Sequence, residues 1–239
     1  HSVEITTIAD IPSRGTGLGS SSALTVGLLN ALHTYAGRSP DAEQLAEEAC
    51  RIEIDILGQP IGRQDQYAAA FGGSNQISFL ANDLVEVTPI NLDSKALEDN
   101  YFLVYTGMTR KASGILAKQS ASSDKKRSEL DSLRQQAVEV RQALESGNHA
   151  AVGHLLDASW QIKRNLVDGI TASSLDELYS EIISMGATGG KLLGAGGGGF
   201  FLFQGSDEIR SKVEGEHKLI PLVMDSAGST IIFDDGSRL

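Results

Sequence analysis

The sequence predicts an α+β protein with two domains. At about 150 residues per domain, the 239 residues allow one large domain or two modest ones. Amphipathic helical patterns are mixed with a few strand-like segments, which is typical of the α+β class. A polar stretch at residues 91–100 separates two such groups. We therefore expect domains at residues 1–97 and 98–239.

The first half of the chain opens with a strand-like segment. Apolar and β-branched residues at 3–8 favour a strand, and the proline and glycines of 12–19 are expected to end it as a loop. Apolar residues spaced at i, i+4, i+7 and i+8 predict a helix over 20–36. A second apolar stripe, with Pro40 at a first helical position, predicts a helix that ends near Gly58. Shorter elements follow: a buried helix at 66–71 and strands at 77–79 and 84–87.

The second half combines strands with longer helical patterns. An apolar segment at 101–105 predicts a buried strand. Helical periodicity follows, and a glycine run then precedes a second apolar strand. The expected elements are helices at 111–146, 149–166, 174–186 and 207–215, a strand at 200–203, and a strand pair at 220–224 and 230–233.

Charge and cysteine content exclude some classes of function. The chain has 20 Lys and Arg against 31 Asp and Glu, a net charge of -11, which argues against binding to a nucleic-acid backbone. A small anion is not excluded, because local amides and one or two cations can hold it. The single cysteine, Cys50, and the absence of an apolar run of ~18 residues predict a cytoplasmic protein without a membrane partner. Because His1 leads directly into a strand-like pattern, we expect a fragment or a processed chain.

The first glycine cluster lies between the predicted first strand and the predicted first helix. Loop amides and the helix N-terminus would face an anion together there, and glycines let the backbone approach a ligand closely. The cluster is not a Walker A motif, because no lysine follows Gly19. The alternative is a plain turn with a serine N-cap. The candidate phosphate-binding residues are Gly15, Thr16, Gly17, Leu18, Gly19, Ser20, Ser21 and Ser22.

The second glycine cluster, residues 194–199, matches the pattern G-x-G-x-x-G. A dinucleotide-binding fold needs this pattern after a strand and before a helix. Here a helix precedes the cluster and a strand follows it. We interpret the cluster as backbone that passes very close to another loop or to a ligand.

Two carboxylates between the clusters are candidates for chemistry. Glu53 lies on the shoulder of its helix's apolar stripe, about 80° from the centre, and a solvated glutamate is the alternative. Asp65 lies where a turn-rich segment meets a buried helix. It is either the N-cap of that helix or a base that accepts a hydroxyl proton while a metal ion neutralises phosphates. The five histidines make no close ligand pair, so catalytic zinc is not expected.

Taken together, these segments resemble the second and third signature motifs of the GHMP small-molecule kinases, which include galactokinase, mevalonate kinase and homoserine kinase. The resemblance rests on residues 12–23, on Glu53 and Asp65 with a separation of 12, and on residues 191–199. It implies a two-domain fold: a truncated N-terminal α/β domain with a left-handed βαβ phosphate-loop unit, and a ferredoxin-like C-terminal domain. Family members carry a further N-terminal segment, which we expect this chain to lack.

The resemblance also implies roles for the candidate residues. The first loop would wrap the phosphates of ATP, and Gly196 and Gly197 of the second loop would pack beside it. Ser21 and Glu53 are implied as ligands of Mg²⁺. Asp65 is implied as the catalytic aspartate.

Within the family, residues 62–73 and 105–110 look most like those of the D-glycero-D-manno-heptose 7-phosphate 1-kinases. This implies transfer of the γ-phosphate of ATP to the anomeric hydroxyl of the heptose phosphate, in nucleotide-heptose synthesis. Arg110 and Lys111, with Gly196, would bind the substrate phosphate; ordinary surface cations are the alternative. The expected partners are ATP and a sugar phosphate, and a homodimer is left open. Two other functions stay open: another GHMP sugar kinase, such as a galactokinase-like enzyme, and a non-catalytic module that senses sugar and nucleotide.

Overall fold

The computed structural model of the chain describes residues 3–9, 16–109, 112–122 and 126–236. Their contacts form two compact units. The first unit holds residues 3–9, 19–89 and 225–236, and the second holds residues 16–18 and the described residues from 90 to 224. Each unit combines helices with antiparallel strands, so the predicted α+β class is confirmed. The expected domain boundary at residue 97, between domains 1–97 and 98–239, stays a prediction.

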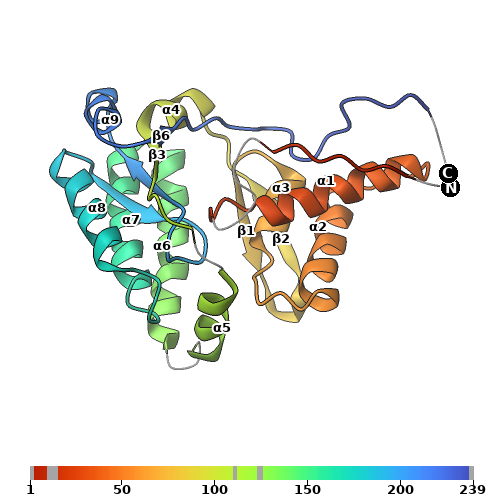
Figure 1. Cartoon of the computed structure of the whole chain (residues 1–239), viewed down its shortest axis with the longest axis horizontal. Helices are drawn as coiled ribbons and strands as arrows, with labels where there is room; N and C mark the ends of the chain where they lie inside the picture. The colour runs from red at the N-terminus through yellow and green to blue at the C-terminus, as the bar shows by residue number, and fades with distance from the viewer. Residues whose placement is uncertain (1–2, 10–15, 110–111, 123–125, 237–239) are drawn as a thin grey trace. The chain divides into compact units, whose positions relative to one another are not determined.

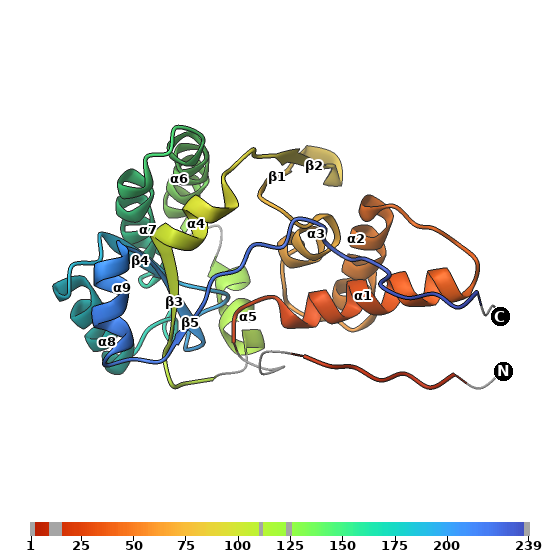
Figure 2. The same cartoon turned by 90° about the horizontal axis from the view of Figure 1, so that it is seen from above.

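Three α-helices build the first unit (Figure 2). They are α1 (Ser20–Tyr35), α2 (Ala42–Cys50) and α3 (Gln64–Phe71). Val26 of α1, Ala46 of α2 and Tyr67 of α3 are buried together in one apolar cluster. The helices predicted from residue 20 and from residue 40 are therefore confirmed. The apolar stripe of the second helix lies in the core through Leu45 and Ala49. The stripe predicted for α1 does not: Leu24 is 51% exposed and Leu32 is 39% exposed, and α1 buries Val26 instead.

The second predicted helix changes its character part-way. After Cys50 the chain continues as a π-helix, η1 (Arg51–Ile56). The N–H of Leu57 donates to the carbonyl oxygen of Ile52, a bond that spans five residues and is typical of π geometry. A π turn contains more residues than an α turn, so it rotates the following side chains around the helix axis.

A two-stranded antiparallel sheet follows α3. β1 (Asn75–Phe79) pairs with β2 (Val85–Pro89), with Ile77 opposite Val87. A short 3-10 turn, η2 (Ala81–Asp83), joins the strands. The two predicted strands are therefore confirmed.

The segments at the two ends of the described chain form no strand. Ile8 is 91% exposed and Ile232 is 97% exposed, and residues 3–9 run as an extended trace without a strand in Figure 2. A strand needs a neighbour to pair its N–H and C=O groups, and no strand of the described residues pairs with either segment. The strands predicted at 3–8 and 230–233 are therefore wrong, and the strand expected before α1 in a βαβ unit is not formed in the described part.

The tail after residue 224 belongs to the first unit. Asn30 of α1 donates its side-chain amide to the carbonyl oxygen of Ser229 at 3.2 Å, and the N–H of Gly73 donates to the carbonyl oxygen of Asp225. These bonds hold the tail beside α1 and α3 without sheet pairing.

The second unit contains a four-stranded antiparallel sheet with the order β4-β5-β3-β6 (Figure 1). The chain visits a strand, helices, two strands, a helix and a last strand, which is the order of a ferredoxin-like fold, so that prediction is confirmed. The elements are α4 (Ser94–Asn100), β3 (Tyr101–Tyr105), α5 (Ala112–Ser122), α6 (Arg127–Glu145), α7 (His149–Lys163), α8 (Ser173–Ser184), β4 (Gly189–Leu192), β5 (Phe200–Gln204), α9 (Asp207–Glu214) and β6 (Leu219–Ile220).

The core of the second unit is aromatic. Trp160 of α7 meets Phe201 of β5 edge to face, with ring centroids 5.4 Å apart. Ile182 of α8 is fully buried in the same cluster. This core fixes α7 and α8 on the sheet and therefore fixes the loops that leave them. Among the described residues, none of the helices has the length and apolar character to cross a membrane.

Two elements of this unit were not predicted. Residues 91–100, interpreted as a polar boundary, contain α4, whose Asp93 N-cap accepts a hydrogen bond from the N–H of Lys95. β4 was missed because its two glycines and a lysine have little strand propensity. It forms because β5 supplies its hydrogen-bonding partner.

Candidate active site

The N-terminus of α1 lies at the end of the first glycine cluster. Gly19 is the N-cap residue, with φ of 69° and no side-chain cap, so a serine does not cap this helix as the alternative supposed. A positive φ favours glycine at this position. The first turn of a helix presents N–H groups without intrahelical acceptors and carries partial positive charge. This end of α1 therefore suits an anion.

The π turn buries Glu53 beneath that helix end. Only 1% of Glu53 is exposed, although α-helical spacing predicted the shoulder of the apolar stripe. Glu53 is directed toward α1, where the hydroxyls of Ser21 and Ser22 donate to its carboxylate. The solvated alternative for Glu53 is therefore wrong.

Three side chains donate hydrogen bonds to the Glu53 carboxylate. Ser21 donates to Oε1 at 2.5 Å, and Ser22 donates to Oε2 at 2.7 Å. Gln66 donates its Nε2 to the same Oε2 at 2.7 Å. A buried carboxylate needs such partners, because an unpaired buried charge is very costly.

Asp65 lies in the first turn of α3 and faces the same helix end. Arg63 is the N-cap of α3, so the N-cap alternative for Asp65 is wrong. A Cβ on Gly19 would lie 3.4 Å from Cγ of Asp65, which is ordinary van der Waals contact. Burial raises the pKa of Asp65 above its usual value, and the Glu53 charge adds to this while Gln64 opposes it. A raised pKa makes this carboxylate a stronger acceptor for a hydroxyl proton.

The oxygens of Ser21 and Glu53 suit a magnesium ion. Mg²⁺ prefers oxygen ligands in octahedral geometry, in which adjacent ligands lie about 2.9 Å apart. The two oxygens are 2.5 Å apart, and Ser21 is exposed to solvent. A small movement of the Ser21 hydroxyl would therefore let both oxygens bind one ion.

In the second unit, the glycine run packs against residues 16–17 of the first glycine cluster. A Cβ on Gly194 would lie 2.4 Å from Cα of Gly17, and a Cβ on Gly199 would lie 2.2 Å from the carbonyl oxygen of Thr16. Contacts that short do not occur, so only glycine fits at both positions. The interpretation of the run as closely approaching backbone is confirmed.

Two further glycines of the run approach other loops. A Cβ on Gly196 would lie 2.9 Å from the Ile170 side chain, and a Cβ on Gly198 would lie 2.6 Å from the carbonyl oxygen of Met108. The N–H of Gly197 donates to the carbonyl oxygen of Ile170 at 2.8 Å. The Gly197 amide is therefore engaged within the unit.

A lysine from the last turn of α7 holds the start of this run. Nζ of Lys163 donates to the carbonyl oxygens of Leu192 at 3.0 Å and Gly194 at 2.5 Å. Burial lowers the pKa of Lys163 to about 7, and the charge of Lys191 adds to the effect. The Lys163 side chain thus holds the loop that contacts Gly17.

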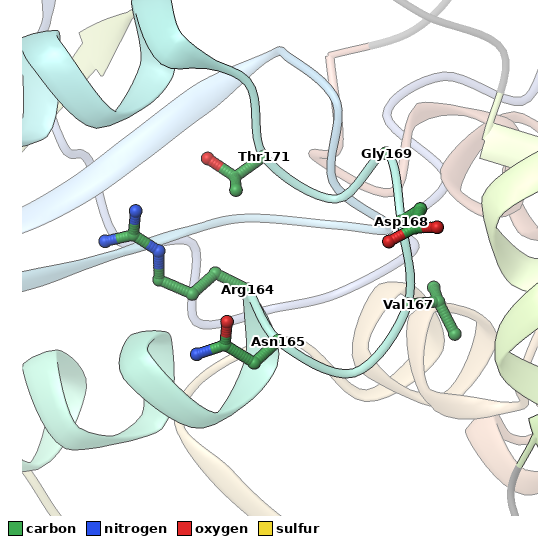
Figure 3. Close-up of a pocket in the computed structure, with 6 residues that line it drawn as sticks. All are labelled: Arg164, Asn165, Val167, Asp168, Gly169 and Thr171. Atoms are coloured by element: carbon green, nitrogen blue, oxygen red, sulfur yellow. The ribbon is translucent and has the colours of Figure 1, made fainter.

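A small pocket lies in the loop that joins α7 to α8 (Figure 3). Its volume is about 230 Å³. Arg164 pairs with Asp176 at 2.6 Å, and the Asn165 amide donates to the carbonyl oxygen of Gln161. In Figure 3 the Arg164 guanidinium points away from Asp168, so the polar groups do not converge on one ligand. The lining residues are Arg164, Asn165, Val167, Asp168, Gly169 and Thr171.

The structure brings Ser21, Ser22, Glu53 and Asp65 together in the first unit. Three other candidates, Gly15, Arg110 and Lys111, lie outside the described residues. The roles of all candidates stay predictions.

Sequence reasoning missed Gln66 and Lys163 as contributors to these two regions. The sequence holds a weak signal for Gln66, because Ala70, an apolar residue four positions later, shares its helix face. Lys163 carries no comparable signal, because its contacts are to backbone carbonyls far along the chain.

Comparison with known proteins gives two matches. The family model described as GHMP kinases N terminal domain matches residues 1–73, and the model described as GHMP kinases C terminal matches residues 140–217. The chain belongs to the GHMP kinase family. This agrees with the resemblance of its two glycine motifs.

Individual GHMP kinases are similar over most of this chain. The D-glycero-alpha-D-manno-heptose 7-phosphate kinase of Campylobacter jejuni is 34% identical over 207 residues, which cover 84% of this chain and 61% of that protein. A galactokinase of Pyrococcus furiosus is 28% identical, covering 80% and 60%. The crystal structure of a D-glycero-D-manno-heptose 1-phosphate kinase from Bacteroides thetaiotaomicron has a TM-score of 0.71 at 27% identity, covering 92% and 64%. This GHMP chain thus spans about three fifths of the length of these relatives.

Proposed function

We propose that the protein is an ATP- and Mg²⁺-dependent kinase that phosphorylates a sugar hydroxyl. The observation that carries the proposal is the cluster at the N-terminus of α1. There a hydroxyl and a buried carboxylate adjoin at 2.5 Å, and a second carboxylate of raised pKa contacts the N-cap glycine. Phosphoryl transfer requires ligands for a metal ion, a site for the phosphates and a base.

In this mechanism the loop of residues 15–19 and the amides of α1, from Ser20 to Ser22, bind the phosphates of ATP. The Ser22 hydroxyl is engaged with Glu53, so Ser22 contributes through its backbone. Gly196 and Gly197 are assigned to ATP binding as well, and the Gly197 amide already donates to the carbonyl oxygen of Ile170.

Asp65 acts as the base. The substrate hydroxyl places its proton on the Asp65 carboxylate while its oxygen attacks the γ-phosphorus in line. The bond from the γ-phosphorus to the β,γ-bridging oxygen breaks, and ADP and a sugar phosphate ester form. When held by Ser21 and Glu53, Mg²⁺ neutralises the phosphate charge.

We further propose D-glycero-D-manno-heptose 7-phosphate as the substrate, phosphorylated at its anomeric hydroxyl for nucleotide-heptose synthesis. Support comes from the C. jejuni relative, at 34% identity, and from the amino-acid sequence of residues 62–73, which resembles that of the heptose 7-phosphate kinases. Arg110 and Lys111, with Gly196, are assigned to the substrate phosphate because a doubly charged anion needs local cations. A cytoplasmic location belongs to this proposal, in keeping with the free, buried Cys50.

A galactokinase-like specificity is the second candidate, favoured by the P. furiosus relative. A sensor without catalysis is the third. It accounts less well for the cluster, because binding alone needs no base beside the anion site.

The test follows ADP release from Mg-ATP with a panel of sugars and sugar phosphates. Turnover that depends on heptose 7-phosphate supports the full proposal. Turnover with galactose or another unphosphorylated sugar keeps the kinase and replaces the substrate. Nucleotide binding without turnover for any sugar supports the sensor. Reactions with EDTA in place of Mg²⁺ serve as the control and are expected to release no ADP.

A further inference from the structure

The side chain of Gln66 is fully buried and only half satisfied. Its exposure is 0%, and its Nε2 donates to Oε2 of Glu53 at 2.7 Å. Its Oε1 has no hydrogen-bond partner among the described residues. The opposite amide orientation would place Oε1 against a carboxylate oxygen, so the contact with Glu53 determines the orientation.

This arrangement costs stability. A buried carbonyl oxygen without a donor destabilises a fold, and a residue kept only for packing would avoid it. The amide therefore needs a reason beyond packing, and its single partner is Glu53.

The hydrogen bonds on Glu53 are divided unequally between its two oxygens. Oε2 accepts from both Ser22 and Gln66, each at 2.7 Å. Among the described residues, Oε1 accepts from Ser21 alone. Ser22 is 2% exposed whereas Ser21 is exposed. Oε2 is thus directed into the protein, and Oε1 is the oxygen beside the solvent-facing hydroxyl.

We propose that Gln66 is a positioning residue that fixes the rotation of the Glu53 carboxylate, so that Oε1 alone is presented with Ser21 to a divalent cation. With Oε2 held by two donors, Glu53 cannot turn to offer both oxygens. Gln66 directly follows Asp65, and successive helical residues point about 100° apart. The first turn of α3 therefore supplies the proposed base on one side and the positioning amide on the other. This inference rests on the proposed function.

The test uses Gln66→Met, which keeps the side-chain length and removes the donor. Binding of Mn²⁺, a paramagnetic substitute for Mg²⁺, is measured by electron paramagnetic resonance in the presence of ADP. We expect binding to weaken about 10–100-fold, the usual effect of losing a partner of a metal ligand. ADP affinity in EDTA is expected to change less than about twofold, because Gln66 donates to Glu53 and not to the nucleotide, which is proposed to bind the backbone N–H groups at the N-terminus of α1.

The matched control is Asn30→Leu. Asn30 is another buried amide of the first unit, 8% exposed, and its side chain donates to Ser229. Its replacement removes a buried amide of similar size without touching Glu53, so Mn²⁺ binding is expected to stay at the wild-type value. If Gln66→Met fails to fold, Ser22→Ala removes the other donor to Oε2 with a smaller change in volume. It is expected to give the same selective loss.

The outcomes separate this inference from the proposed function. If the wild-type chain binds Mn²⁺ with ADP and Gln66→Met binds it equally well, the positioning role is overturned and the kinase proposal stands. Equal losses in Gln66→Met and Asn30→Leu also overturn it, because they indicate general destabilisation. If the wild-type chain binds ADP without any effect of Mn²⁺, the metal site of the proposed function fails, and this inference fails with it.

Discussion

The two glycine-containing regions are built in opposite ways. At the N-terminus of α1, polar side chains from α1 and α3 converge on one buried carboxylate, Glu53 of η1. In the glycine run of the second unit, the backbone segments pack closely because side chains are absent. Gly194 lies so close to Gly17 that a Cβ on Gly194 would clash with it. The first region offers functional groups, and the second offers shape.

This difference predicts two kinds of sensitivity. A site made of side chains should lose chemistry when one atom changes and still fold. A site made by backbone contact should lose its structure when one carbon is added. The following substitutions test this contrast.

The largest effect is expected from Asp65→Asn, which replaces one carboxylate oxygen by an amide group. Loss of a general base lowers a rate by about 10²–10⁴-fold, so kcat should fall by that factor. The free energy of unfolding should stay the same or rise, because burial disfavours the charged form of Asp65. ADP release at saturating Mg-ATP measures the rate, and urea unfolding measures stability.

The control for Asp65→Asn is nucleotide affinity, expected within about threefold of wild type because the phosphate amides are untouched. A variant that keeps its kcat would show that Asp65 is not the base. If Asp65→Asn lost stability as well as activity, the site at α1 would respond to substitution in the same way as the glycine run, and the two regions would not differ as proposed.

Gly194→Ala is expected to act on structure. Its φ is 64°, a conformation that costs a residue with a side chain about 1–3 kcal/mol. The new Cβ would also lie 2.4 Å from Cα of Gly17, and overpacking adds about 1–3 kcal/mol. We expect the second unit to lose about 2–6 kcal/mol. Trp160, the single tryptophan of the chain, is buried in that unit and reports its unfolding by fluorescence.

The matched control in the same unit is Gly114→Ala, since nothing lies within 4 Å of a Cβ built there. Its effect should be stabilising or neutral. Equal stability of Gly194→Ala and wild type would show that the run is not fixed by close backbone approach.

The sequence predicts elements that carry a clear apolar pattern. α1 was expected at 20–36 and spans Ser20–Tyr35, and β3 lies at Tyr101–Tyr105 as expected from a short apolar run. The pattern did not identify the buried face of α1, where Leu24 is 51% exposed. The strand expected at 3–8 did not form, since a strand depends on a partner that periodicity does not contain.

For the candidate site, the sequence identified the residue types but not their arrangement. Ser21, Glu53 and Asp65 stand out through motif spacing, and the structure brings them together. The burial of Glu53 could not be foreseen, because it depends on the π turn of η1 and on donors more than 30 residues away in α1. Gln66 was overlooked for the same reason: its importance lies in a partner that only the fold supplies.

A smaller, pH-dependent effect on stability is expected from Lys163. This residue combines the two kinds of site, because its titratable side chain donates to backbone carbonyl oxygens of the glycine run. Its pKa is lowered from 10.5 to about 7 in the folded protein. Between these values the unfolded chain binds more protons, so the free energy of unfolding should rise with pH. The slope for one such group is at most about 1.4 kcal/mol per pH unit.

Lys163→Met tests this linkage. The variant keeps the length of the side chain and removes the titrating group, so the rise between pH 7 and 9 should flatten. Part of the slope should persist, because the pKa of Lys191 is also lowered by burial. Urea unfolding followed by Trp160 fluorescence measures it. An unchanged slope would mean that Lys163 stays charged throughout and that its two carbonyl acceptors outweigh its burial.

The smallest effect is expected from Gly27→Ala in the middle of α1. This substitution tests whether glycine is required only where backbone segments approach closely. No atom lies within 4 Å of a Cβ at this position, and the backbone is helical. Alanine is favoured over glycine in a helix by about 0.5–1 kcal/mol, so the first unit should gain that amount. Hydrogen exchange of the α1 amides measures the gain locally. Destabilisation here would show that a Cβ at position 27 meets a neighbour, so that this glycine, like Gly194, is required by close approach.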